Sequence, residues 1–262
     1  MFRNCFFTIA AGLLTLSASV GTAEAALVIN PGIPITHRVN VQPIVLADDD
    51  GSNPATYLGA STGDIHHQID QIWAQAGIDV TWSDPNSWNH SFANFGNMPA
   101  STTRPRSDLD AILAAGVAGG LTSPDPHVLN MFFVRISPGH AQLSENSVAG
   151  LAQLVGGAST MFVGSNLPGL MFQGDPLGND LVAKVIAHEI GHNLGLPHLN
   201  EPQNLMLESD GVQPVNAILN PTQIARARTS SFAVAVAVPE PTTVLAVPLI
   251  AWVIAARKRR GY

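Results

Sequence analysis

Cysteine is nearly absent from this 262-residue sequence, because Cys5 is the only one. It lies in an N-terminal stretch with the features of a cleaved export signal, so we expect the mature protein to contain no cysteine. Disulfide bonds are therefore excluded, although an exported protein could form them. A latent state in which a cysteine binds a metal ion is excluded for the same reason.

Charged residues are also scarce, at 12%, and basic residues are the scarcer kind. Twelve lysines and arginines stand against 19 aspartates and glutamates, which gives a net charge of −7. This balance argues against nucleic-acid binding, which needs a basic face. Between the two terminal segments, roughly 210 residues are ample for one core without disulfide support. We expect a single acidic domain over residues 26–238, with its core at about 35–230.

The N-terminus has the three parts of a signal peptide over residues 1–25. Arg3 supplies the positive start, residues 6–20 form an apolar run, and Ala23-Glu24-Ala25 is an A-x-A cleavage site. The apolar run is short for a membrane span. We therefore expect an exported protein.

The C-terminus carries a second targeting pattern over residues 239–262. Pro239-Glu240-Pro241 precedes an apolar run from Val244 to Ala256, and the basic cluster Arg257–Arg260 follows. The basic cluster should stay cytoplasmic. The tail resembles the PEP-CTERM sorting signals of bacterial envelopes, which an exosortase processes. That resemblance implies membrane contact through the tail alone; a plain C-terminal membrane anchor is the alternative.

Hydrophobic periodicity predicts an alternation of strands and helices. Strands are expected at Ile35–Ala47, Ile78–Trp82, His127–Ile136 and Ala158–Val163, and helices at Ser61–Ala76, Asp108–Ala115 and Ile224–Arg228, the last capped by Asn220 with Pro221 at its first turn. Residues 83–106 are rich in asparagine, serine and proline and predict a long loop. Residues 137–157 predict an irregular segment.

Two groups of polar residues leave alternatives open. Asp48-Asp49-Asp50-Gly51-Ser52-Asn53 could wrap calcium, but a solvated turn explains the cluster equally well. The remaining histidines lack ligand spacing: His66 and His67 are expected on the surface of their helix, and the others are interpreted as structural or surface residues, namely His37, His90, His127 and His140. A second zinc site that uses His140 stays open.

Residues 188–198 combine histidines and a glutamate at the spacing of a metal site. They read H-E-x-x-H-x-x-G-x-x-H, with His188, Glu189, His192, Gly195 and His198 at the fixed positions. Apolar residues upstream recur at helical spacing, so His188 and His192 project from one helix face. Gly195 permits the left-handed conformation that ends a helix. The chain then turns back and brings His198 as a third ligand.

Three neutral imidazoles leave a fourth coordination position open, which indicates a catalytic zinc site. Zinc lowers the pKa of water to about 7. Glu189, beside a ligand, is placed to take the proton of the attacking water and to deliver it to a leaving amine. A coincidental string on a core helix is the alternative, and the complete eleven-residue pattern makes it a poor one.

The motif resembles that of the metzincin clan of zinc metallopeptidases. The resemblance implies that Met206, the only methionine after the motif, forms a methionine turn beneath the metal. It also implies an α+β zincin fold: a twisted mixed sheet, a backing helix, a zinc-binding helix and a small C-terminal subdomain. In this clan an edge strand before the zinc helix binds extended peptide by strand addition, which points here to Ser159–Val163.

Two residues depart from the family's usual signatures. Leu199 follows the third histidine, and Leu207-Glu208 follows the methionine, so no tyrosine is available two residues after it. The sequence thus predicts a secreted or envelope-associated zinc endopeptidase that acts on peptide or protein substrates. The alternative is an envelope or extracellular-matrix protein whose metal site is catalytically silent.

Overall fold

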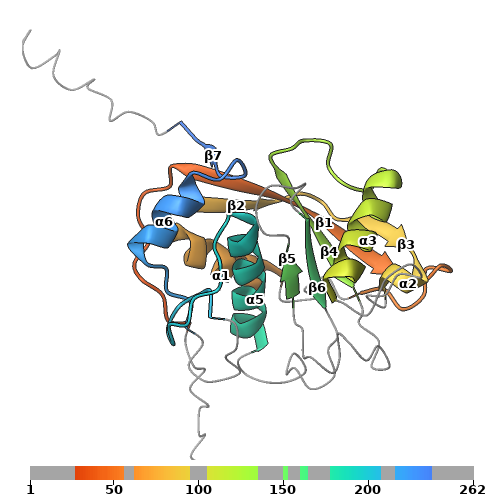
Figure 1. Cartoon of the computed structure of the whole chain (residues 1–262), viewed down its shortest axis with the longest axis horizontal. Helices are drawn as coiled ribbons and strands as arrows, with labels where there is room; N and C mark the ends of the chain where they lie inside the picture. The colour runs from red at the N-terminus through yellow and green to blue at the C-terminus, as the bar shows by residue number, and fades with distance from the viewer. Residues whose placement is uncertain are drawn as a thin grey trace, which may run out of the picture.

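A mixed sheet with helices packed against it forms the body of the molecule (Figure 1). The computed structural model describes residues 27–55, 62–94, 105–134, 150–152, 160–164, 178–207 and 216–237. The expected α+β zincin architecture is confirmed: the strands lie in one sheet, and the helix that carries the histidine motif lies along it.

The sheet has the strand order β2-β1-β4-β6-β5, and two further short strands pair with β1. Its strands are β1 (His37–Ala47), β2 (Ile78–Trp82), β3 (Asn86–Asn89), β4 (Val128–Val134), β5 (Gly150–Ala152), β6 (Thr160–Gly164) and β7 (Val234–Ala235). Pairing is parallel except between β5 and β6 and between β1 and β7. The sheet is therefore mixed, with an antiparallel strand at one edge.

The long strand β1 organises the sheet. Its first half pairs with β2 and its second half with β3 along one edge, while β7 and then β4 pair along the other. Val39, Val41, Ile44 and Leu46 of β1 are fully buried, and polar residues alternate with apolar ones in its first half. β4 instead has the near-continuous apolar run of a strand covered on both faces, since residues 129–134 are buried and only Asn130 among them is polar.

Two helices pack together against the sheet, and each contributes one apolar face to the core. These are α1 (Thr62–Ala74) and α5 (Gly178–Asn193). Ile65, Ile69, Ile72 and Trp73 form the buried face of α1, as their spacing predicts. The matching face of α5 consists of Ala183, Ile186, Ala187 and Ile190. The remaining helices are α2 (Ser91–Asn94), α3 (Pro105–Ala118) and α6 (Pro221–Arg228).

The predicted loop over residues 83–106 is wrong in its first half, because β3 and α2 lie there. Neither has an apolar period: β3 reads Asn-Ser-Trp-Asn and gains its strand conformation from pairing with β1. Asp49 and Ser91 exchange hydrogen bonds at the start of α2, each side chain accepting from the other's backbone N–H at 2.9 Å. Contacts distant in sequence thus create both elements.

The predicted irregular segment at 137–157 is also wrong at its end, where β5 pairs with β6. A three-residue strand has no periodicity to recognise, and its partner supplies its conformation. His66 is likewise not a surface residue. It is half-buried and stacks on Trp82, with ring centroids 4.3 Å apart.

The carboxylates of the acidic cluster accept hydrogen bonds from the protein itself. Asp48 accepts from the side-chain amides of Asn53 and Asn94, and Asp50 accepts from Ser52 N–H. These bonds are consistent with the interpretation of the cluster as a turn.

Both targeting segments lie outside the described residues, as do Cys5, Ser159, His140 and Glu208. Within the described part of the chain, no helix has the length and apolar character that a membrane crossing requires.

Candidate metal centre

The end of α5 is built to reverse the chain after the second histidine. Gly195 has φ +92°, in the left-handed region. Its N–H donates to the carbonyl of His192 at 2.9 Å, and Leu196 N–H donates to the carbonyl of Gly191 at 2.8 Å. This pair of bonds is the Schellman motif. The role predicted for Gly195 as a helix terminator is therefore what the structure shows.

The three motif histidines meet at one point. Each offers one ring nitrogen, and these nitrogens lie within 4.8 Å of one another. The Nε2 atoms of His192 and His198 are 3.0 Å apart. Burial decreases along the set, from His192 (7% exposed) through the half-buried His188 to the exposed His198. The site therefore has a buried floor and opens to solvent beside His198.

Backbone carbonyls fix the orientation of the first two rings. Nδ1 of His188 lies 2.8 Å from the carbonyl oxygen of Leu205, and Nδ1 of His192 lies 2.8 Å from that of Leu196. A carbonyl can only accept, so each Nδ1 carries the proton and each Nε2 is the unprotonated nitrogen, which is the atom that can bind a metal ion. Ligating histidines are usually held in this way.

The electrostatic setting keeps the first ligand neutral. Burial lowers the pKa of His188 to about 3, against the weaker opposing effect of its bond to Leu205. The neighbouring His192 and His198 lower this pKa further. At neutral pH the ring is therefore uncharged, the form in which imidazole binds a metal ion.

These residues fit zinc. A tetrahedral site with Zn–N bonds of about 2.0–2.1 Å separates its ligand nitrogens by about 3.3 Å, close to the 3.0 Å between His192 and His198. Three neutral nitrogen donors with carbonyl-fixed rings form a donor set of the catalytic zinc type. Glu189 follows His188 directly on α5, and its side chain is 5% exposed.

Met206 packs beneath the helix turn that carries the ligands. It is fully buried, and a Cβ atom placed on Gly191 would lie 2.6 Å from its Sδ. Gly191 lies between Glu189 and His192 in the motif, so the methionine side chain fits against bare helix backbone. Leu199, the first departure from the family signature, donates its N–H to the Met206 carbonyl at 2.9 Å and closes the loop between ligand and methionine.

The strand predicted to bind substrate is not an edge strand. β6 lies between β4 and β5, with both of its edges paired. Among the strands that the structure describes, the edge position belongs to β5, which runs antiparallel to β6. The prediction assigned the edge position to β6 because the preceding strand, β5, lies in a segment whose sequence has no strand pattern.

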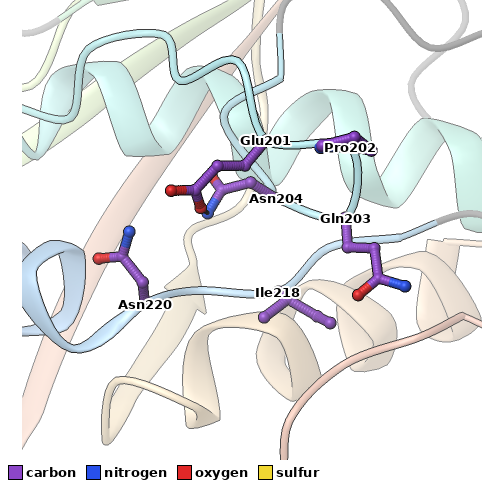
Figure 2. A pocket seen from close by; sticks show the side chains of 6 residues that line it. All are labelled: Glu201, Pro202, Gln203, Asn204, Ile218 and Asn220. Atoms are coloured by element: carbon purple, nitrogen blue, oxygen red, sulfur yellow. Dashed lines mark hydrogen bonds between the residues drawn. The ribbon is translucent and has the colours of Figure 1, made fainter.

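A pocket of about 410 Å³ opens beside the loop that follows His198 (Figure 2). It is lined by Glu201, Pro202, Gln203, Asn204, Ile218 and Asn220. Neither Glu189 nor any of the three histidines takes part in the lining, so this pocket is separate from the metal centre.

Sequence reasoning missed three buried amide side chains that join segments distant in sequence. Asn204 and Gln223 are buried and face each other across 19 positions of sequence. Gln75, also buried, donates to the carbonyls of Ile72 and Ala217 and accepts from the N–H groups of Asn30 and Leu219. The spacing Asn220-x-x-Gln223 is a capping-box signal, but it gives no indication of Asn204.

Three of the other histidines, His37, His90 and His127, form hydrogen bonds with nearby protein groups. His90 Nδ1 accepts from Ala93 N–H, His127 Nδ1 lies 2.7 Å from the Ser231 carbonyl oxygen, and His37 Nδ1 lies 2.8 Å from Thr36 Oγ1. Their predicted structural role is consistent with these contacts.

Comparison with known proteins supports one family. The Matrixin model of the M10 peptidases matches residues 47–220, well over half of the chain. Among curated proteins, none matches significantly.

Three solved structures that match this chain have low sequence identity and low TM-scores. Metalloproteinase-II from Bacteroides fragilis is 14% identical with a TM-score of 0.41, over 75% of this chain and 56% of that protein. Archaemetzincin from Methanopyrus kandleri is 16% identical with a TM-score of 0.39, over 74% of this chain and 88% of the other. A zinc-dependent peptidase from Methanocorpusculum labreanum is 14% identical with a TM-score of 0.37, over 71% and 92%.

The family assignment rests on the Matrixin match and on the three-histidine centre within the matched region, at the end of a helix terminated by Gly195. The chain therefore belongs to the matrixin family of zinc metallopeptidases.

Proposed function

We propose that this protein is a zinc-dependent endopeptidase in which His188, His192 and His198 hold the metal and Glu189 is the general base. The observation that carries the proposal is the convergence of three histidine nitrogens beside a buried glutamate on the same helix. A purely structural centre has no need of a carboxylate at that position.

Zinc, when bound, supplies a Lewis acid that polarises the scissile carbonyl and lowers the pKa of water. Glu189 takes a proton from the attacking water as its oxygen bonds to the carbonyl carbon. The carbon–nitrogen bond then breaks, and Glu189 returns the proton to the leaving amine. The carbonyls of Leu205 and Leu196 keep two ligand rings fixed throughout.

Among the described strands β5 forms the edge of the sheet beyond β6, and we infer that an extended substrate chain adds there. Strand addition uses the backbone of the peptide and leaves its side chains for other contacts. This geometry suits cleavage within a polypeptide, and it supports proteins or long peptides as the substrate class.

The test compares two variants of the mature domain. Glu189→Gln should retain about one zinc per chain and lose hydrolysis of casein by roughly 10²–10⁴-fold, the usual contribution of a general base. His192→Ala should lose the zinc itself. Elemental analysis and zymography with and without a chelator measure both. Casein hydrolysis by Glu189→Gln within about threefold of wild type contradicts the assignment of the base, and absence of hydrolysis in the zinc-loaded wild type supports a silent metal site.

We further propose that the protein is exported and that its tail is a sorting signal removed by an exosortase-type enzyme. The three parts of residues 239–262, in order at the C-terminus, support this. A permanent anchor accounts for the apolar run and the basic cluster, but gives no reason for Pro239-Glu240-Pro241.

Intact-mass measurement on protein from the native host tests this proposal. The mass should correspond to a chain that starts near residue 26 and ends near residue 238. A mass that includes residues up to Tyr262 would leave the anchor as the explanation.

A further inference from the structure

Asn204 and Gln223 form a buried pair of side-chain amides between the methionine turn and α6. Asn204 Nδ2 donates to Gln223 Oε1 at 2.9 Å, and Gln223 Nε2 donates back to Asn204 Oδ1 at 2.8 Å. The two residues are 2% and 7% exposed. A reciprocal pair of this kind constrains both side chains, and losing one partner leaves buried polar atoms unsatisfied.

The amide orientations follow from their backbone partners. Asn204 Oδ1 also accepts Met206 N–H at 2.9 Å, and Gln223 Oε1 also accepts Asn220 N–H at 2.9 Å. A backbone N–H can only donate, so each oxygen must face it. Asn204 Nδ2 lies 3.3 Å from the carboxylate of Glu201 as well, so all its hydrogen-bonding positions are used. Figure 2 shows Glu201 and Asn204 close together on one side of the pocket, with Asn220 on the other.

This network is continuous with the metal centre. Asn204 shapes the turn that contains Leu205 and Met206, and the Leu205 carbonyl accepts the Nδ1 proton of His188. At its far end, α6 is anchored to the end of α1, because Arg228 Nε donates to the Ala76 carbonyl at 2.7 Å. The helix is thus fixed at both ends, and Asn204 links its amino end to the turn whose Leu205 carbonyl orients His188.

We propose that Gln223 is a positioning residue for the metal centre, acting through Asn204 and the Leu205 carbonyl on the ring of His188. This inference rests on the proposed ligand role of His188. Helix α6 therefore affects zinc affinity as well as packing against the rest of the domain.

The capping box of α6 offers a matched control. The Asn220 side chain accepts Gln223 N–H at 2.9 Å and caps the helix, while the amide pair uses only the backbone N–H of Asn220. Asn220→Ala therefore weakens α6 and leaves the pair intact. Gln223→Met has nearly the same size as wild type and good helix propensity, but it removes the pair.

The experiment measures zinc affinity of the full mature domain by competition with a chromophoric chelator. Gln223→Met should bind zinc about tenfold more weakly than wild type, at the low end for partners outside the ligand shell, while Asn220→Ala should stay within about twofold. A second readout uses the metal-free protein: nitrogen-15 NMR of His188 should show the Nδ1-protonated tautomer in wild type and Asn220→Ala, and a mixture in Gln223→Met.

Each outcome has a separate meaning. Equal zinc affinity and an unchanged His188 tautomer in Gln223→Met and Asn220→Ala overturn the inference. Undiminished zinc binding by His188→Ala overturns the ligand assignment instead. If Gln223→Met does not fold, Asn204→Asp takes its place, because it keeps the acceptor for Met206 N–H and loses both amide donors. Wild-type zinc affinity in that variant also refutes the role of the pair.

Discussion

Gly191 and Met206 are in close contact, and the size of each residue limits what the other position can hold. The methionine sulfur occupies the space where a side chain on Gly191 would begin. Glycine in a helix interior costs up to about 1 kcal/mol relative to alanine. The absence of a side chain at Gly191 allows Met206 to pack closely beneath the turn that carries the ligands.

The effect of Gly191→Ala should therefore depend on Met206. In the wild-type background, overpacking of about 1–3 kcal/mol opposes the gain in helix propensity, and we expect net destabilisation. With Met206→Ala, which by itself costs about 2–5 kcal/mol, the same substitution should stabilise by up to about 1 kcal/mol. Urea unfolding of the four proteins measures this change of sign, and additive effects would show that the two residues do not compete for space.

His66 gives the stability of the protein a pH dependence. Burial against Trp82 lowers its pKa from 6.5 to about 4. Between these values the unfolded chain binds a proton that the folded protein does not, so stability falls as pH falls from about 6.5 to about 4. The neighbouring Asp70, whose pKa burial raises to about 6, acts in the opposite direction.

His66→Phe keeps an aromatic ring on Trp82 and removes the titrating group. As pH falls from 7 to 5, wild type loses the stability that His66 contributes and the variant does not. The free energy of unfolding of the variant minus that of wild type should therefore be larger at pH 5 than at pH 7. Denaturant unfolding at both pH values gives this difference, in which the contributions of Asp70 and of the zinc ligands cancel. If the free energy of unfolding changes equally with pH in both proteins, a residue other than His66 causes the acid sensitivity.

At the scale of elements, the carboxyl end of α5 decides where the third ligand lies. The left-handed Gly195 allows the turn, and the two Schellman bonds hold it. His192 Nδ1 reaches the Leu196 carbonyl in the same turn, so the geometry of the chain reversal and the orientation of a ligand depend on the same backbone.

Gly195→Ala should cost about 1–2 kcal/mol, the penalty for a side chain in the left-handed region. It should also weaken zinc binding, since the displaced turn carries His198. Gly120→Ala is a suitable comparison: it has φ +66° and open space around it, far from the motif. We expect both variants to lose a similar amount of stability, and only Gly195→Ala to bind zinc more weakly. Equal zinc affinities of the two variants would contradict this expectation.

Elements with a strong local period could be predicted from the sequence, and so could the centre itself. The apolar faces of α1 and the burial of β4 follow from residue spacing, and the eleven-residue motif gives three histidines that do converge. The strands β3 and β5 could not be predicted, because pairing with distant strands makes them. The partnership of Asn204 with Gln223 depends on where α6 docks, which no local pattern encodes.

At the scale of the whole molecule, zinc should act as a stabilising ligand. A metal bound only by the folded state adds about 2.7 kcal/mol when its free concentration is 100 times Kd. For a domain of this size that corresponds to roughly 5–10 °C in Tm. Calorimetry with zinc or with a chelator should show this shift in wild type and in Glu189→Gln. The shift should be absent in His198→Ala; its persistence there would remove His198 from the ligand set.

The position of β1 has a further consequence for how the chain folds. This strand is synthesised early, yet its partners β4 and β7 come from residues 128–134 and 234–235. Contacts so distant in sequence are slow to form, because the entropy of closing the intervening chain is lost before pairing repays it. Until then the edge of β1 that later pairs with β4 and β7 is exposed, and an unpaired edge is a template for association with other chains. We therefore expect the unfinished polypeptide to be the aggregation-prone species, until β7, the last strand within the described residues, pairs with β1.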